Sequence, residues 1–237
     1  MQVTYIGHSG FAVALERCTL LFDYYLGNIP AFAPGKPVYV FASHAHRDHF
    51  NFAIFDLWEK YPDVTYILSK DIRRKWSPGW LTRHGISQGA QGAVTFMGAK
   101  ERLQFGEITV ETLNSTDEGV AFIVTAEGKT IYHAGDLNDW TWDGEPEEEN
   151  RAMQEAYRQE IGRLAGRRID LAFLPLDPRQ EGDFYRGFDY FMGHTDTVKA
   201  YPMHFWEDFG VFARLRALPC SEPYRDRIAG EGEYKTS

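Results

Sequence analysis

The sequence predicts one α/β domain whose first half is rich in strands. The chain has 237 residues, a length that suits a single domain of this class and can bury a large core. Strand-like runs separated by turns fill much of the first half, and long segments with helical spacing follow later. We find no internal repeat. Residues 1–237 are therefore expected to form one domain.

The expected strands are short apolar or alternating runs bounded by turn-prone residues. They cover residues 2–6, 11–15, 19–23, 37–42, 64–68, 93–97, 108–113, 120–125, 129–133 and 169–176. The runs 120–125 and 129–133 are joined across Glu127-Gly128, a pair that favours a tight turn and so predicts a hairpin.

Apolar residues at helical spacing predict helices over residues 51–61, 147–164, 189–200 and 207–218. In the second of these segments the apolar stripe contains Met153, Ala156, Tyr157, Ile161 and Leu164. Gly166 lies two residues past Leu164 and is the residue type that most often ends a helix. Helices therefore close each strand-rich half of the chain.

Composition narrows the class of protein. The formal net charge of −9 opposes non-specific binding to nucleic acid, and we expect a small-molecule substrate instead. No stretch approaches the twenty apolar residues of a membrane span, and the first residues lack the pattern of a signal peptide. The two cysteines, Cys18 and Cys220, are far apart, which favours a reduced, cytoplasmic location. The sequence does not predict the oligomeric state.

The most informative segment is His44-Ala45-His46-Arg47-Asp48-His49, which directly follows an apolar run. Imidazole and carboxylate groups are the ligands that zinc and similar ions prefer. His44 and His46 are two residues apart and should share one face, because side chains alternate along an extended chain. Asp48 and His49 follow this pair, where the chain starts a helix, and their side chains are expected to point into the space beside the first metal position. The segment therefore predicts two adjacent metal positions.

This H-x-H-x-D-H motif resembles the signature of the metallo-β-lactamase superfamily. Three further parts of the family pattern match at Asp23, Asp136 and His204. The Gly7-His8-Ser9-Gly10-Phe11 segment and the residues before Asp136 look most like the branch that includes ascorbate-phosphate lactonase and the phospholipase D of N-acyl ethanolamine lipids. The resemblance covers residues 2–206 and implies a four-layer αβ/βα sandwich. It also implies that Asp136 bridges the two metal positions and that His204 closes the site.

One departure from the family pattern concerns the first metal position. The family has another histidine before the bridging aspartate, but residues 113–122 contain none. Asp117 could replace it as an oxygen ligand, water could complete the position, or the position could be weak or empty. Asp48, His49, Asp136 and His204 would still give the second position a full set. We expect one or two zinc ions, with manganese as an alternative.

The expected activity is hydrolysis, because zinc-class ions generate hydroxide from bound water near neutral pH. By resemblance, Asp48 is both a ligand and the group that orients or deprotonates this metal-bound hydroxide. The expected substrate is a small metabolite ester, lactone or phosphodiester. The alternatives are a lipid or nucleotide phosphodiesterase and a non-catalytic metal-containing binding protein.

Several other residues are candidates for the site. His8 is expected near the metals, as a hydrogen-bond partner of a ligand carboxylate or as a catalytic group. His194 is a candidate acid for the leaving group, with a polar residue at a helix start as the alternative. Trp140 and Trp142 follow Asp136 and are candidates for the substrate wall or for loop anchors. Asp177 ends a buried strand and is a pocket candidate or a turn residue.

Overall fold

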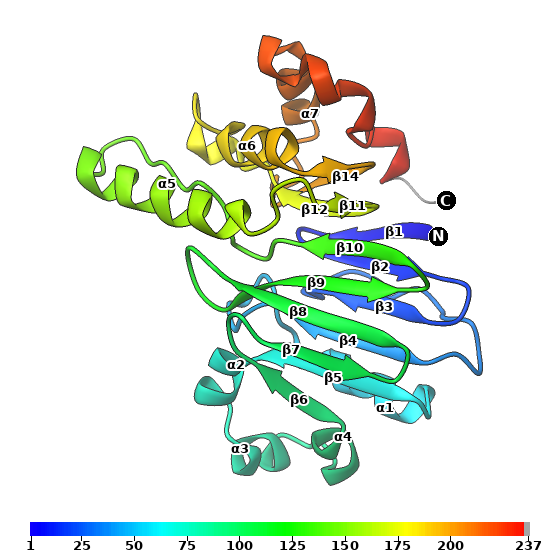
Figure 1. Cartoon of the computed structure of the whole chain (residues 1–237). Helices are drawn as coiled ribbons and strands as arrows, with labels where there is room; N and C mark the ends of the chain where they lie inside the picture. The colour runs from blue at the N-terminus through cyan, green and yellow to red at the C-terminus, as the bar shows by residue number, and fades with distance from the viewer. Residues whose placement is uncertain (235–237) are drawn as a thin grey trace.

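The computed structural model describes residues 1–234, and its centre is a pair of six-stranded sheets (Figure 1). The first sheet has the strand order β1 (Gln2–Gly7), β2 (Gly10–Ala14), β3 (Thr19–Phe22), β4 (Val38–Ala42), β5 (Val64–Ser69) and β6 (Val94–Met97). The second has the order β14 (Ala200–Met203), β12 (Leu171–Pro175), β10 (Lys129–His133), β9 (Val120–Ala126), β8 (Ile108–Asn114) and β7 (Arg102–Phe105).

Both faces of the first sheet are buried, and the alternation of side chains explains why. In β3, Leu20 and Phe22 belong to the core shared with the second sheet, while Leu21 belongs to the core on the opposite face. Successive side chains of a strand point to opposite faces, so an apolar run such as this one is buried on both sides. Across the sheets, the rings of Phe22 and Phe173 lie 6.0 Å apart between centroids.

Helices cover the two outer faces, which completes the four-layer αβ/βα sandwich (Figure 1). Four short helices lie on the first sheet: α1 (Leu57–Lys60), α2 (Lys70–Lys75), α3 (Pro78–Arg83) and α4 (Gln88–Gly92). Three helices lie on the second: α5 (Glu147–Gly162), α6 (Arg186–His194) and α7 (Gly210–Ala217). Phe191 of α6, for example, stacks on Tyr132 of β10. The predicted fold class is confirmed.

Several predicted boundaries are wrong. The segment expected as a helix over residues 51–61 consists of a 3₁₀ turn, η1 (Phe52–Asp56), followed by the single turn α1. The helix expected over residues 189–200 is α6, which ends at His194 and is followed by β13 (Asp196–Thr197). That short strand pairs with β11 (Arg168–Ile169), so the strand expected over residues 169–176 is divided into β11 and β12.

Other elements are absent from the predictions because they are too short to show a clear period. They are α2, α3, α4, β7, β14 and the 3₁₀ segments η2 (Pro178–Gln180), η3 (Pro219–Arg227) and η4 (Glu231–Glu233). Two turns of helix cannot repeat an apolar position often enough to be recognised. Within the described residues no helix is both long and apolar enough to cross a membrane.

Part of each sheet is parallel, and this places the ends of several strands together. β3, β4, β5 and β6 are parallel in the first sheet, and β10, β12 and β14 are parallel in the second. The carboxyl ends of parallel strands meet at one edge of a sheet, where ligands are usually bound in α/β folds. Asp23, Ser43, His133, Asp177 and His204 lie at or just beyond these ends.

Candidate metal centre

The histidine-rich loop begins where β4 ends, and the backbone around Ser43 is unusually crowded. Gly119 has a φ of +74°, and a Cβ atom there would lie 1.9 Å from the Ser43 carbonyl oxygen. Gly135 has a φ of +53°, and its Cβ would lie 2.6 Å from the Ser43 Cβ. Only glycine allows these conformations and approaches without strain. The two glycines therefore let the start of β9 and the turn after β10 close around the loop.

Seven side chains from four segments converge at this point and form two neighbouring groups. One group contains His8, Asp48, His49 and His204, and the other contains His44, His46 and Asp136. Within each group, the atoms that could bind a metal all lie within 4.8 Å of one another. The structure thus brings together the six ligands predicted for the two positions and adds His8.

Asp136 connects the two groups. Its Oδ2 lies 3.3 Å from His44 Nε2 in one group, and its Oδ1 lies 3.1 Å from His49 Nε2 in the other. Its Oδ1 also lies 3.5 Å from His204 Nε2. This position between the two groups fits the bridging role that the resemblance implies, and that role stays a prediction.

Several of these atoms are buried without a hydrogen-bond partner among residues 1–234. They are Nε2 of His8, His44 and His49, and Oδ1 of Asp136. Buried polar atoms of native proteins nearly always have a partner, because burying an unpaired one costs free energy. Four such atoms without a hydrogen bond lie at one point, all on histidine or aspartate side chains, and they fit a bound divalent cation of the zinc class.

The opposite nitrogens of two histidines are held by buried carboxylates. His49 Nδ1 lies 2.7 Å from Asp23 Oδ2, and His204 Nδ1 lies 3.0 Å from Asp177 Oδ2. A carboxylate accepts the proton of Nδ1, which fixes the ring and leaves Nε2 free to bind a metal. Asp177 is fully buried behind His204. It therefore lies in the predicted region but supports a ligand and does not line the pocket.

Charge at the centre favours a cation. Burial by itself would raise the pKa of the Asp136 carboxyl, but the neighbouring His49 and His204 hold that pKa well below its usual value. Burial also opposes ionisation of Asp48, yet His8 and His49 lower its pKa. Both carboxylates are consequently ionised at neutral pH, as are Asp23 and Asp177, and ionised carboxylates are ligands for divalent cations.

The incomplete first position has two acidic neighbours. Asp117 Oδ2 lies 3.7 Å from His46 Nδ1, and Glu118 Oε2 lies 3.6 Å from His46 Nε2. Glu118 also pairs with Lys75 at 2.7 Å, which occupies the same oxygen. Asp117 thus lies beside His46 but outside the group that contains His44, His46 and Asp136. Its role as a ligand stays a prediction.

A small cavity of about 200 Å³ opens onto the centre. Asp136, His204, Asp117, Trp140 and Trp142 line it, as do Thr116, Met153 and Arg179. The two tryptophan rings are nearly parallel, with centroids 5.8 Å apart. Trp140 is also an anchor, because it is buried and its Nε1 donates to the Asp136 carbonyl at 2.9 Å. No pattern in the sequence around Arg179 indicated that this residue would line the site.

The structure places His194 away from the centre, so its expected position beside the pocket is wrong. His194 is the last residue of α6, is exposed, and stacks on Tyr190. Helix α6 runs back from the carboxyl edge of the sheet, and the His194 carbonyl accepts a hydrogen bond from Gly166 near the start of β11. His8, by contrast, reaches the centre, and its Nε2 lies 3.4 Å from Asp48 Oδ2.

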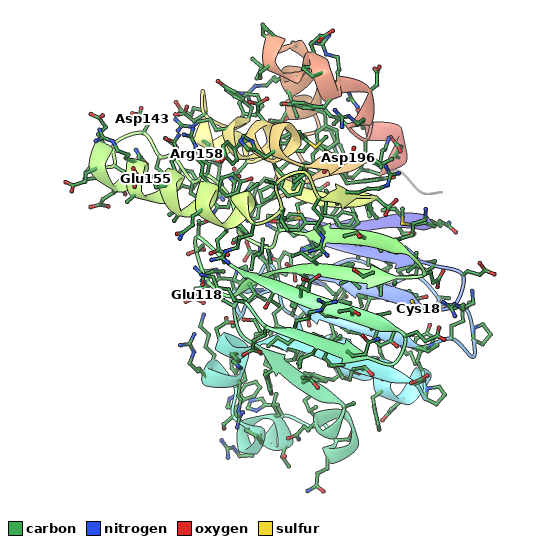
Figure 2. The ribbon with its side chains drawn as sticks, viewed as in Figure 1. Cys18, Glu118, Asp143, Glu155, Arg158 and Asp196 are labelled. Carbon is green, nitrogen blue, oxygen red and sulfur yellow. The ribbon has the colours of Figure 1, made fainter. Side chains whose placement is uncertain are left out.

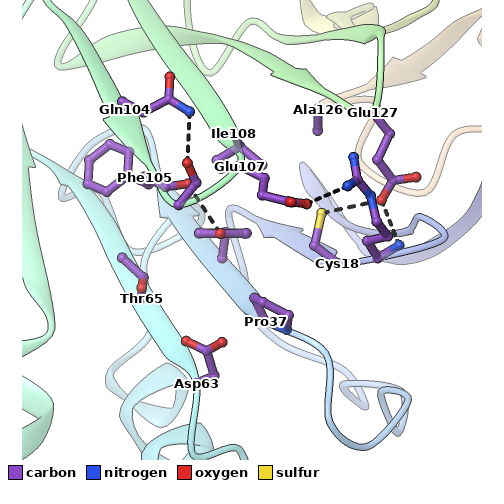
Figure 3. Close-up of a pocket in the computed structure, with 13 residues that line it drawn as sticks. Cys18, Pro37, Asp63, Thr65, Gln104, Phe105, Glu107, Ile108, Ala126 and Glu127 are labelled. Carbon is purple, nitrogen blue, oxygen red and sulfur yellow. Dashed lines mark hydrogen bonds and ion pairs between the residues drawn. The ribbon is translucent and has the colours of Figure 1, made fainter.

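Larger hollows lie outside this small cavity. An aromatic groove of about 550 Å³ beside Arg47 is lined by Tyr25, Phe50, Phe52 and Trp76, among others. A cavity of about 500 Å³ lies between the sheets and includes Cys18, Asp63 and Glu127 in its wall (Figure 3). Figure 2 shows Cys18 at the edge opposite Glu118, which neighbours the metal centre. The second cavity is therefore separate from the centre.

Comparison with known proteins agrees with this geometry. Residues 2–151, more than half of the chain, match the beta-lactamase superfamily domain. The chain belongs to this superfamily. A UPF0173 metal-dependent hydrolase of Opitutus terrae is 31% identical, with 86% of this chain and 85% of that protein covered. A UPF0173 metal-dependent hydrolase of Symbiobacterium thermophilum is 26% identical over 94% of this chain and 95% of that protein.

A solved structure shows the same fold. Igni18, a metallo hydrolase from the archaeon Ignicoccus hospitalis, superposes with a TM-score of 0.59 at 16% identity, over 96% of this chain and 93% of that chain. Together with the family match, the cluster of His and Asp residues identifies the chain as a metal-dependent hydrolase of the metallo-β-lactamase superfamily.

Proposed function

We propose that this protein is a zinc-dependent hydrolase of a small ester, lactone or phosphodiester, and that two adjacent positions hold its metal. The observation that carries the proposal is the convergence of unpaired buried atoms of His8, His44, His49 and Asp136 on one point. The segment Gly7-His8-Ser9-Gly10-Phe11 supports the ascorbate-phosphate lactonase-like branch as part of the same proposal.

Each metal position has its own set of candidate ligands, and the two sets share Asp136. His44, His46 and Asp136 would hold one ion, with Asp117 as the candidate for a further ligand. Asp48, His49, His204 and the shared Asp136 would hold the other. A bound ion of this class lowers the pKa of its water from about 15.7 toward about 7 and so supplies a nucleophile at neutral pH.

The protein's own contribution is to position the reacting groups and handle the proton. Asp48 is 28% exposed, the most accessible of the carboxylates assigned to the second position, and we assign its Oδ2 to orient the attacking water and accept its proton. His8 is buried beside Oδ2 and keeps the carboxylate in place. The side chains of Trp140 and Trp142 form one wall of the small cavity and exclude solvent from that side, which favours a compact substrate.

Elemental analysis of the protein after reconstitution with zinc or manganese tests the metal part of the proposal. His46→Ala should lower both metal content and melting temperature, while His84→Ala, a matched change of an exposed histidine, should alter neither. A panel of lactone, carboxylic ester and phosphodiester substrates then tests the reaction. Absence of any divalent metal after reconstitution would overturn the proposal.

A further inference from the structure

Arg179 reaches the cavity of the metal centre with only part of its guanidinium occupied. It follows β12 in the turn η2, and its Nε and Nη2 donate to the Asp177 carboxylate at 2.5–3.0 Å. This pairing uses one edge of the planar group. Nη1 makes no hydrogen bond within residues 1–234, and the side chain is 50% exposed. The remaining edge, Nη1 with the second proton of Nη2, is free to donate.

Aromatic rings hold the guanidinium in place. Its Cζ lies 4.6 Å from the centroid of Trp206 and 5.7 Å from that of Trp142. Trp206 Nε1 lies 3.3 Å from Asp177 Oδ2, so Trp206 contacts the same carboxylate that pairs with Arg179. Trp206 is 46% exposed and has a φ of +53°, a conformation uncommon for tryptophan. Such strained backbone clusters at functional sites.

This arrangement fixes a half-exposed guanidinium, paired with Asp177 along one edge, beside the histidine and aspartate ligands of the centre. Arg179 lines the same cavity as Asp136 and His204. A planar guanidinium donates two parallel hydrogen bonds to a carboxylate or phosphate, a geometry that lysine cannot reproduce. Stacking on the two rings and pairing with the buried Asp177 already restrict the Arg179 side chain, so less side-chain entropy is lost when a ligand binds.

We propose that Arg179, Trp142 and Trp206 form an anion subsite that binds a carboxylate or phosphate group of the substrate. The subsite rests on the proposed function, because it positions the substrate for hydrolysis at the adjacent centre. It narrows the substrate class to compact anionic molecules. Asp177 links the two parts, since it contacts both Arg179 and the metal-facing His204.

Calorimetric titration of the metal-reconstituted protein tests the subsite. The probes are succinate and inorganic phosphate, with succinamide as the neutral analogue. Arg179→Gln should weaken binding of at least one anion by about 10- to 100-fold and leave binding of succinamide unaltered. Arg179→Lys keeps the charge but loses the fork and should also weaken binding. Arg214→Gln is the matched control, because Arg214 stacks on Phe184 in an exposed position outside the cavity.

The possible outcomes distinguish the subsite from two simpler explanations, namely anion binding by the metals alone and a purely structural role of Arg179. Wild-type affinity in Arg179→Gln would mean that the metals alone bind the anion, and the subsite would be wrong. Loss of metal from both Arg179 variants would show that Arg179 acts only through Asp177 and His204, which also overturns it. If the subsite fails while a neutral ester is still hydrolysed with metal bound, the proposed function stands. If anions bind through Arg179 but the protein neither binds metal nor hydrolyses any substrate, the proposed function fails alone.

Discussion

Replacing Asp23 by asparagine should weaken metal binding although Asp23 is not a ligand. Asp23 is fully buried and accepts three hydrogen bonds: from Ser43 N at 2.7 Å, from Ser43 Oγ at 2.6 Å and from His49 Nδ1 at 2.7 Å. Because Nδ1 of His49 donates to Asp23, Nε2 presents its lone pair to the metal centre. Asparagine has the same size and tolerates the φ of +41° found here.

The magnitude follows from the bonds that asparagine cannot make. It keeps one acceptor oxygen but removes the charge and replaces the other oxygen by an N–H donor. A hydrogen bond to a charged group contributes about 1.5–3 kcal/mol, so losing one or two lowers the free energy of unfolding by about 1.5–6 kcal/mol. Loss of a carboxylate that orients a metal-binding histidine lowers metal affinity by about 10- to 100-fold.

Chelator competition measures the affinity, and urea denaturation of the metal-free protein measures the stability. Asp143→Asn, in an exposed turn near the site, is the matched control and should leave both quantities unchanged. If Asp23→Asn binds metal as tightly as the wild type, the carboxylate does not set the orientation of His49, and the reasoning is refuted.

Three further changes have separate expected outcomes. If Asp117 completes the first position, Asp117→Ala should halve the metal stoichiometry while Glu118→Ala preserves it; an unchanged count in both would exclude Asp117 as a ligand. Trp142→Ala should raise KM with metal content intact, whereas Trp140→Ala should lower the unfolding free energy by about 3–5 kcal/mol because that ring is buried; destabilisation with an unaltered KM in both variants would assign both rings to anchoring. Burial opposes ionisation of Glu127, but the backbone N–H groups that it accepts lower its pKa, so its stabilising effect exists at neutral pH and disappears as the pH falls through that lowered pKa. Glu127→Gln should therefore reduce Tm near about pH 7 and not near about pH 2, and an equal loss at both would contradict this account.

The sequence alone identified the parts of the protein that depend on neighbouring residues. His44, His46, Asp48 and His49 lie within six residues, so strand geometry and ligand chemistry predict a metal site without any knowledge of distant contacts. The longest helix was equally predictable, because α5 repeats its apolar stripe over sixteen residues. Asp136 and His204 were found through the resemblance to the superfamily, and the structure places both beside the loop.

The tertiary structure decided everything that depends on how distant segments meet. Asp177 accepts a hydrogen bond from His204, and Arg179 lines the cavity, because β12 and β14 are neighbours in the second sheet. His194 lies at the edge of the second sheet opposite the metal centre, because α6 runs back along that sheet. None of these relations leaves a local period or motif in the sequence. They arise from sheet register and chain direction, which bring together residues that are neighbours only in space.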